Sequence, residues 1–206
     1  MPNSQFTPLT PSPLSPRCEV RGDEGEGVGD CTASLILGID PGLDTTGYGL
    51  LDLRDGKVLI REAGVIRTTP DESLGSRIEQ IFDGVRDLIT TFHPAVMAVE
   101  QLHSTYEHPQ TAILMGHARG VICLAAAQEA VPIADYRPTH VKKTLTGSGR
   151  ATKDQMQRAI QTEFQLSTPP QPPDVADALA VALCHFYTSR DTTRFLARSR
   201  PTGVRR

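Results

Sequence analysis

The sequence lacks the marks of a membrane-spanning, secreted or disulfide-stabilised protein. Its 206 residues include no apolar stretch of about 18 residues, so we expect no transmembrane helix. The N-terminus has no cationic start followed by an apolar block, which argues against a secretory signal. The four cysteines, none of them in a CxxC pair, are Cys18, Cys31, Cys123 and Cys184. This usage predicts reduced thiols and a cytoplasmic location.

The sequence also lacks a strong overall charge, but its basic residues are unevenly distributed. The formal net charge is only −3, so no positive field covers the whole molecule. Residues 137–158 nevertheless hold six Lys or Arg and one acid, and residues 190–206 hold six Arg and one acid. These two local runs are therefore better guides to an anionic partner than the net charge is.

The chain divides by composition into three segments. Residues 1–33 are rich in Pro, Ser, Thr and Gly and cannot bury enough apolar area to offset their ordering entropy, so we predict a disordered N-terminal extension. Residues 34–188 are long enough for one sizeable core and are predicted to form a single folded domain. Residues 189–206 are predicted to be a basic, disordered tail.

Hydrophobic periodicity within the folded segment predicts an alternation of strands and helices. Strands are predicted at residues 35–40, 46–53, 58–67, 95–100 and 131–136. Helices are predicted at residues 74–92, 110–130, 138–145, 152–165 and 174–187. The first three strands form a meander, and the later strands alternate with helices. The pattern therefore predicts an α/β fold with a five-stranded mixed sheet and helices on both faces.

Two of the predicted strands end in an acidic residue. One apolar run closes on Asp40, just before Pro41-Gly42, and another closes on Glu100. Unbroken apolar runs of this kind are typical of strands buried on both faces. If the two strands are parallel neighbours, these acids have Cα atoms roughly 5 Å apart at one edge of the sheet. An ionised group in such a place is costly unless something pairs with it, and a metal ion is one such partner.

Two further acids precede the last apolar helix. Asp174 and Asp177 are spaced i, i+3, so both project from one face of its first turn. Four carboxylates packed together repel one another unless some take up protons or a cation binds. Hard oxygen ligands suit Mg²⁺ or Mn²⁺ better than Zn²⁺, for which no His/Cys set is present at ligand spacing. The prediction is a metal site, catalytic in function, made by Asp40, Glu100, Asp174 and Asp177.

Each acid also has a plainer interpretation. Asp40 before Pro-Gly could be a turn residue, and Glu100 could be a surface acid at a strand end. Asp174 could be a helix N-cap, with Asp177 interacting with the helix dipole.

Four basic residues near the loop 146–149 and the following helix start are suited to binding phosphates; they are Lys142, Lys143, Arg150 and Lys153. Their plain alternative is a solvated basic face.

Five blocks of sequence carry a resemblance to a known family. They are ILGIDPGLDTTGYGLL, AVEQL, GHARGV, HVKKTLTGSGRATKDQM and DVADALAVALCH. In this order, over residues 35–188, they resemble the RuvC family of Holliday-junction resolvases. The resemblance implies a ribonuclease H-like fold, a homodimer, and Mg²⁺-dependent incision of two strands of like polarity at a four-way DNA junction during recombination and repair. Mn²⁺ is a possible substitute, with two ions expected in each active site.

The resemblance also assigns roles to residues and partners. The four acids match the family's four acidic positions, and Lys142 and Lys153 match positions that contact DNA. Products with 5′-phosphate and 3′-hydroxyl ends, a nucleoid-associated cytoplasmic location and a RuvA-RuvB branch-migration partner are implied as well. One departure falls just after Glu100, where relatives carry an aromatic residue that stacks on bases. Here His103 or Tyr106 could stack, or the loop could simply be mobile and polar.

Several alternatives remain open at this point. The helix at residues 110–130 is apolar on more than one face, which favours a dimer contact, although burial within its own domain would also explain it. A ribonuclease H-like nuclease acting on another branched DNA or on RNA would have the same acids. An ATP-binding protein of the actin and sugar-kinase type would need a second Gly-rich phosphate loop and a longer chain, and the sequence shows neither. A catalytically silent junction-binding protein would not need the complete acid set.

Overall fold

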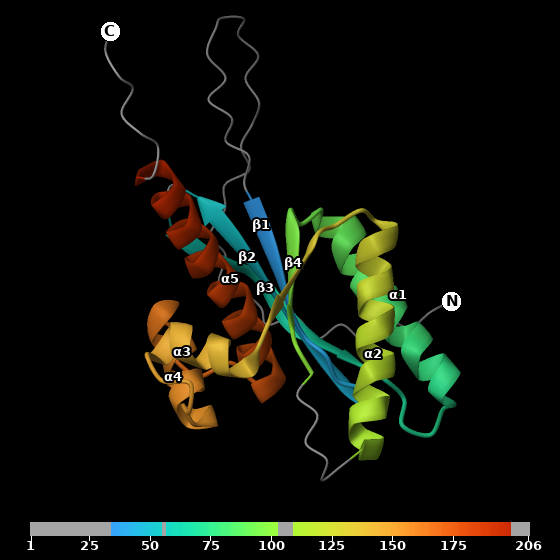
Figure 1. Cartoon of the computed structure of the whole chain (residues 1–206). Helices are drawn as coiled ribbons and strands as arrows, with labels where there is room; N and C mark the ends of the chain where they lie inside the picture. Colours follow the sequence, from blue (N-terminus) through green and yellow to red (C-terminus); the bar gives the residue numbers. More distant parts are fainter. Residues whose placement is uncertain (1–33, 55–56, 103–108, 199–206) are drawn as a thin grey trace, which may run out of the picture.

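A five-stranded mixed sheet lies between two groups of helices (Figure 1). The computed structural model describes residues 34–54, 57–102 and 109–198. The strands are β1 (Ser34–Asp40), β2 (Thr45–Arg54), β3 (Lys57–Arg67), β4 (Val96–Glu100) and β5 (Ile133–Tyr136). The helices are α1 (Leu74–Phe92), α2 (Pro109–Gln128), α3 (Pro138–Thr146), α4 (Lys153–Glu163) and α5 (Pro173–Arg198).

The strand order in the sheet is β3-β2-β1-β4-β5. The first three strands pair antiparallel as a meander, whereas β1 with β4 and β4 with β5 pair parallel. Ile39 lies opposite Val99 in the β1–β4 ladder, so the next residues along the two strands, Asp40 and Glu100, end at the same edge. The predicted mixed sheet is confirmed, including the parallel pairing of the two strands that end in acids.

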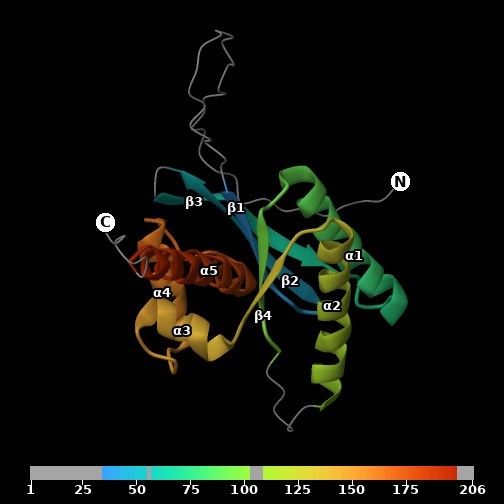
Figure 2. The ribbon, with the colours of Figure 1, turned by 45° about the horizontal axis from the view of Figure 1, so that its top comes forward.

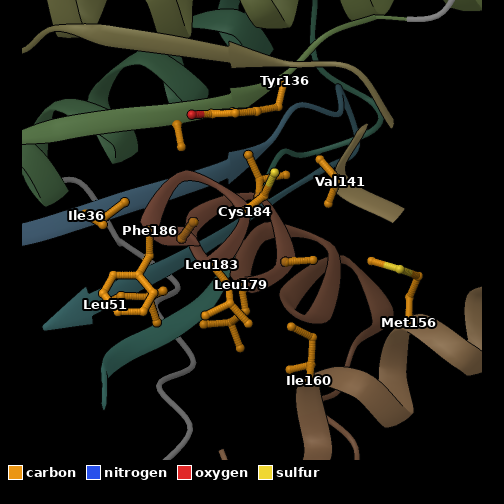
Figure 3. Packing of buried hydrophobic residues seen from close by; sticks show 14 of the residues in the cluster. Ile36, Leu51, Tyr136, Val141, Met156, Ile160, Leu179, Leu183, Cys184 and Phe186 are labelled. Carbon is orange, nitrogen blue, oxygen red and sulfur yellow. The ribbon is translucent and has the colours of Figure 1, made fainter. Parts of the chain in front are cut away.

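The helices cover both faces of the sheet (Figure 2). One core cluster joins the sheet to α1 and α2, and includes Leu37 and Ile39. The other joins the opposite face to α3, α4 and α5, and includes Ile36 (Figure 3). Alternate residues of β1 thus point to opposite cores, as the pleat of a strand requires. A strand buried on both faces explains why its sequence is a continuous apolar run rather than an alternating one.

Helix α5 approaches the sheet closely because glycines lie beneath it. A Cβ atom at Gly38 would lie 2.2 Å from the carbonyl oxygen of Ala178, and one at Gly47 would lie 2.1 Å from that of Asp174. Both separations are far below any van der Waals contact, so no residue larger than glycine fits without moving α5. The glycines of β1 and β2 therefore bring the acid-bearing end of α5 against the end of β1 that carries Asp40.

The predicted order and type of all ten elements are confirmed, but the end of the last helix is wrong. We expected it to stop at about residue 187, whereas α5 continues to Arg198. Residues 189–198 are therefore helical and not part of a disordered tail. Residues 1–33 and 199–206 lie outside the described residues, so the predictions for those segments stay untested. In the described part of the chain, no helix has both the length and the apolar character needed to cross a membrane.

Candidate active site

Three of the four predicted acids line one pocket at the end of the sheet. Asp40 from β1, Glu100 from β4 and Asp177 from α5 face a cavity of about 210 Å³. One ordered water needs only about 10–15 Å³ of such space, so hydrated cations and a phosphate group have room there. The remaining lining residues are Pro138, Val141, Lys142, Lys153, Met156 and Ala180. The structure thus brings together side chains that lie far apart in the sequence.

The pocket favours the protonated form of its acids while no cation is bound. Burial, followed by the charges of Glu100, Asp177 and Asp174, raises the pKa of Asp40 to about 8, although Lys153 acts in the opposite direction. Burial and then Asp177 raise the pKa of Glu100 to about 7, opposed by Lys142. Burial also raises the pKa of Asp177. A divalent cation would stabilise the ionised form of these carboxyl groups strongly, because they are poorly solvated and lie close to other negative charges.

Asp174 lies at the margin of this cluster and does not line the pocket. Its backbone and Cβ pack over Gly47, which pairs directly with Asp40 across β1 and β2. Its charge contributes to raising the pKa of both Asp40 and Asp177, which confirms that it is an electrostatic neighbour of both. Asp174 is therefore close enough to influence the acids of the pocket, although it is not among the residues that line the cavity.

Lys153 forms an ion pair inside the site. Its Nζ atom lies 3.4 Å from Oδ2 of Asp177. A capping box fixes the start of α4 beside it: the Gln155 N–H donates to Oγ1 of Thr152 at 3.3 Å, and the Thr152 N–H donates to Oε1 of Gln155 at 2.9 Å. Lys142 on α3 also lines the pocket. The two lysines, which were predicted to contact DNA, therefore lie among the acids.

The other predicted DNA contacts have different outcomes. Lys143 and Arg150 are exposed and are not among the residues that line the pocket. They flank Gly147, whose φ of 76° ends α3 in the left-handed conformation that glycine adopts readily. His103 and Tyr106 lie outside the described residues, so the structure gives no position for either. The contact between Tyr136 and His185 could not be predicted from the sequence, because it depends on how β5 packs against α5.

The donor chemistry of the pocket fits Mg²⁺ or Mn²⁺. All four predicted ligands are carboxylates, the hard oxygen donors that these ions prefer. Within the described residues, however, no three His, Cys, Asp or Glu side chains are already arranged to hold an ion. One reason is visible at Asp177, whose carboxylate is paired with Lys153. The residues present therefore fit such an ion by chemistry and location, with side-chain adjustment needed at the site.

A sheet of this order, with acids at the adjacent ends of β1 and β4 and on the crossing helix α5, defines a ribonuclease H-like protein. The family model described as "Crossover junction endodeoxyribonuclease RuvC" matches residues 36–185. The chain belongs to the RuvC family.

Named relatives agree with this assignment. The crossover junction endodeoxyribonuclease RuvC of Rhodopirellula baltica is 49% identical over 160 residues, which cover 78% of this chain and 90% of that protein. The Moorella thermoacetica protein of the same name is 47% identical over 151 residues, covering 73% and 90%. The structure of Thermus thermophilus RuvC in complex with Holliday junction substrate is similar with a TM-score of 0.72 and 32% identity, covering 78% of this chain and 97% of that one.

Proposed function

We propose that this protein resolves four-way (Holliday) DNA junctions by incising two strands of like polarity, as an endodeoxyribonuclease of recombination and repair. The main observation in support is that Asp40, Glu100 and Asp177 line one pocket in a chain of the RuvC family. The similarity to a RuvC bound to a Holliday junction supports the choice of substrate. Incision is proposed to leave 5′-phosphate and 3′-hydroxyl ends.

The four acids are proposed to hold two Mg²⁺ ions, or Mn²⁺ in their place. When bound, such ions activate a water molecule and stabilise the departing 3′ oxygen. Asp40 lines the pocket and interacts electrostatically with all three other acids, so it would be the central ligand of such ions. Glu100 reaches the pocket from the sheet, and Asp177 and Asp174 approach from α5. Ligation needs ionised carboxylates, so cation binding must displace the protons that burial and repulsion favour on Asp40 and Glu100.

The DNA backbone is proposed to enter along α3, the loop after it and the start of α4. Lys142 and Lys153 would meet the phosphate beside the acids, while Lys143 and Arg150 would contact phosphates further out. The positive end of the α4 helix dipole also favours an anion there. Because each phosphate contact releases counterions, affinity for the junction should fall with salt. His103 and Tyr106 remain proposed stacking residues at the crossover.

Symmetric cleavage needs two active sites, and α2 is proposed to supply the contact between two subunits. One face of α2 is buried in its own domain, where Ala118 and Ile122 are fully covered. Its other faces expose Ile113, Leu114 and Leu124 at 60%, 39% and 49%. Apolar side chains exposed together on one helix are typical of a protein interface. Both interpretations of this helix thus have support, and the exposed side is the proposed dimer surface.

The RuvA-RuvB complex is a further proposed partner.

Cleavage of matched substrates tests this function. The wild-type protein, titrated with Mg²⁺ and separately with Mn²⁺, should incise a synthetic four-way junction at two symmetric positions and leave a linear duplex largely intact. Asp40→Asn should bind the junction with unchanged affinity and fail to cut it. Faster cleavage of an RNA–DNA hybrid or of another branched DNA would favour the alternative nuclease. Normal cutting by Asp40→Asn would rule out the proposed site.

A further inference from the structure

Tyr136 lies where three elements that carry site residues meet. It ends β5 and pairs with Glu100 in the β4–β5 ladder. Its carbonyl oxygen accepts a 2.8 Å hydrogen bond from the N–H of Gln101, the residue that follows Glu100. The side chain is only 9% exposed. The strand pairing and the hydrogen bond from Gln101 therefore hold the backbone of Tyr136 directly against the strand end that presents Glu100.

The side chain of Tyr136 connects this strand end to α5 and α3. Its hydroxyl group lies 2.9 Å from Nδ1 of His185, a residue of α5. Its ring meets those of His185 and of His140 on α3 edge to face, with centroids 5.9 Å and 5.7 Å apart. Figure 3 shows Tyr136 at the sheet, across from the α5 residues Leu183 and Cys184.

These contacts bear on the spacing of the acids. Glu100 is on β4, whereas Asp177 is on α5, so the gap between them depends on how α5 sits against this side of the sheet. Close glycine contacts fix α5 against β1 and β2. On the side of β4 and β5, the phenol of Tyr136 reaches across to α5 instead. Burial lowers the pKa of His185, so its ring is neutral near pH 7. Its Nδ1 atom can then accept a hydrogen bond from the hydroxyl group of Tyr136.

We infer that Tyr136 is a positioning residue for the acidic pocket, which acts through His185 to set α5, and hence Asp177, against Glu100. The inference rests on the proposed function, because the pocket is the proposed cleavage site. Small displacements of reacting groups can slow a reaction by about 100-fold. Loss of the Tyr136 hydroxyl group can therefore slow cleavage even though it does not touch the reacting atoms. Loss of the hydroxyl group is expected to affect cation binding and turnover more than junction affinity.

Tyr136→Phe tests the role because it removes the hydroxyl group and keeps the ring. We expect the single-turnover cleavage rate at saturating junction to fall by about 10- to 100-fold. Mn²⁺ affinity, measured by electron paramagnetic resonance without DNA, should fall severalfold, while the junction Kd measured without divalent cations should change less than about twofold. Tyr187→Phe is the matched control, since it also removes a tyrosine hydroxyl group, here one on α5 that donates to Glu163 on α4 at 2.6 Å. The control should leave the cleavage rate and the Mn²⁺ affinity unchanged.

A second pair of variants tests the partner. Asn places an amide group near the position of Nδ1, so His185→Asn should retain more cleavage and Mn²⁺ binding than His185→Leu, even if Tyr136→Phe folds poorly. Equal effects of Asn and Leu, unchanged Mn²⁺ affinity in Tyr136→Phe, or equal losses in Tyr187→Phe would overturn the inference. If the wild-type protein cuts no junction, the proposed function fails, and Mn²⁺ binding still decides whether Tyr136 positions the acids.

Discussion

Replacing Asp40 by Asn removes the carboxyl group whose pKa the pocket perturbs most. In the folded, cation-free protein its pKa rises from 3.8 to about 8, mainly through burial and then through neighbouring acids. The folded protein therefore keeps a proton on Asp40 that the unfolded chain releases above about pH 4. Because the folded state binds more protons, the stability from this group is complete below the unfolded pKa and is lost as the pH rises toward about 8.

The size of the effect follows from this linkage. Each pH unit between the two pKa values lowers the free energy of unfolding by about 1.4 kcal/mol, or about 4 kcal/mol between pH 5 and pH 8. Asp40 is partly open to the solvent in the pocket, so we expect about half of this, about 2 kcal/mol. Asn cannot ionise and escapes the loss. The stability of Asp40→Asn relative to wild type should therefore increase by about 2 kcal/mol from pH 5 to pH 8.

Chemical denaturation in the presence of a chelator, repeated across this pH range, measures the difference. Excess Mg²⁺ at pH 8 should stabilise the wild-type protein more than Asp40→Asn, because a ligand that binds only the folded state raises its stability. Asp87→Asn is a suitable control, since Asp87 is exposed on α1, which packs on the face of the sheet opposite to α5. Parallel pH profiles for wild type and Asp40→Asn would show that folding does not raise the pKa of Asp40.

Three further predictions concern DNA binding, the packing of α5 and assembly. Lys142→Ala and Lys153→Ala should each weaken junction binding and reduce the salt slope by about one unit, as measured by anisotropy in a salt titration; unchanged affinity at every salt concentration would contradict this. Gly38→Ala should cost about 1–3 kcal/mol in thermal unfolding and slow cleavage, because its Cβ would lie 2.2 Å from the backbone of α5; a wild-type melting temperature would count against the packing. Leu124→Glu should convert the dimer to monomers in ultracentrifugation. The control Leu59→Glu, at a residue of β3 that is 53% exposed, should leave the dimer intact. A monomeric wild-type protein at micromolar concentration would exclude the dimer.

Local patterns account for what could be predicted from the sequence. Helix α1 matches its predicted bounds of 74–92 because its apolar spacing is regular and its ends are marked: the Ser73 side chain caps the start, and His93 adopts a left-handed conformation just before Pro94. The meeting of Asp40 and Glu100 was predictable because both close apolar runs, and parallel strands bring such ends to one edge. These features depend only on residues near one another in the sequence.

What could not be predicted depends on packing between distant segments. The polar, basic composition after residue 188 indicates disorder, yet a helix already nucleated by its buried part gains one hydrogen bond for each residue it adds, so α5 continues to Arg198. The Lys153–Asp177 ion pair arises only because the start of α4 lies beside α5. The contact between Tyr136 and His185 likewise depends on the placement of β5 across from α5. No spacing rule within one element predicts either contact.

The two lysines explain how the pocket keeps its acids together before a cation binds. Lys153 lowers the pKa of Asp40 and Asp177, and Lys142 lowers that of Glu100 and Asp177, so each ammonium group offsets part of the repulsion among the acids. Removing either lysine should therefore alter cation binding as well as phosphate contact. Junction affinity of the lysine variants must for this reason be measured without divalent cations, where a loss reports the phosphate contact alone. A loss seen only with Mg²⁺ present would instead place the lysine's main effect on the acids.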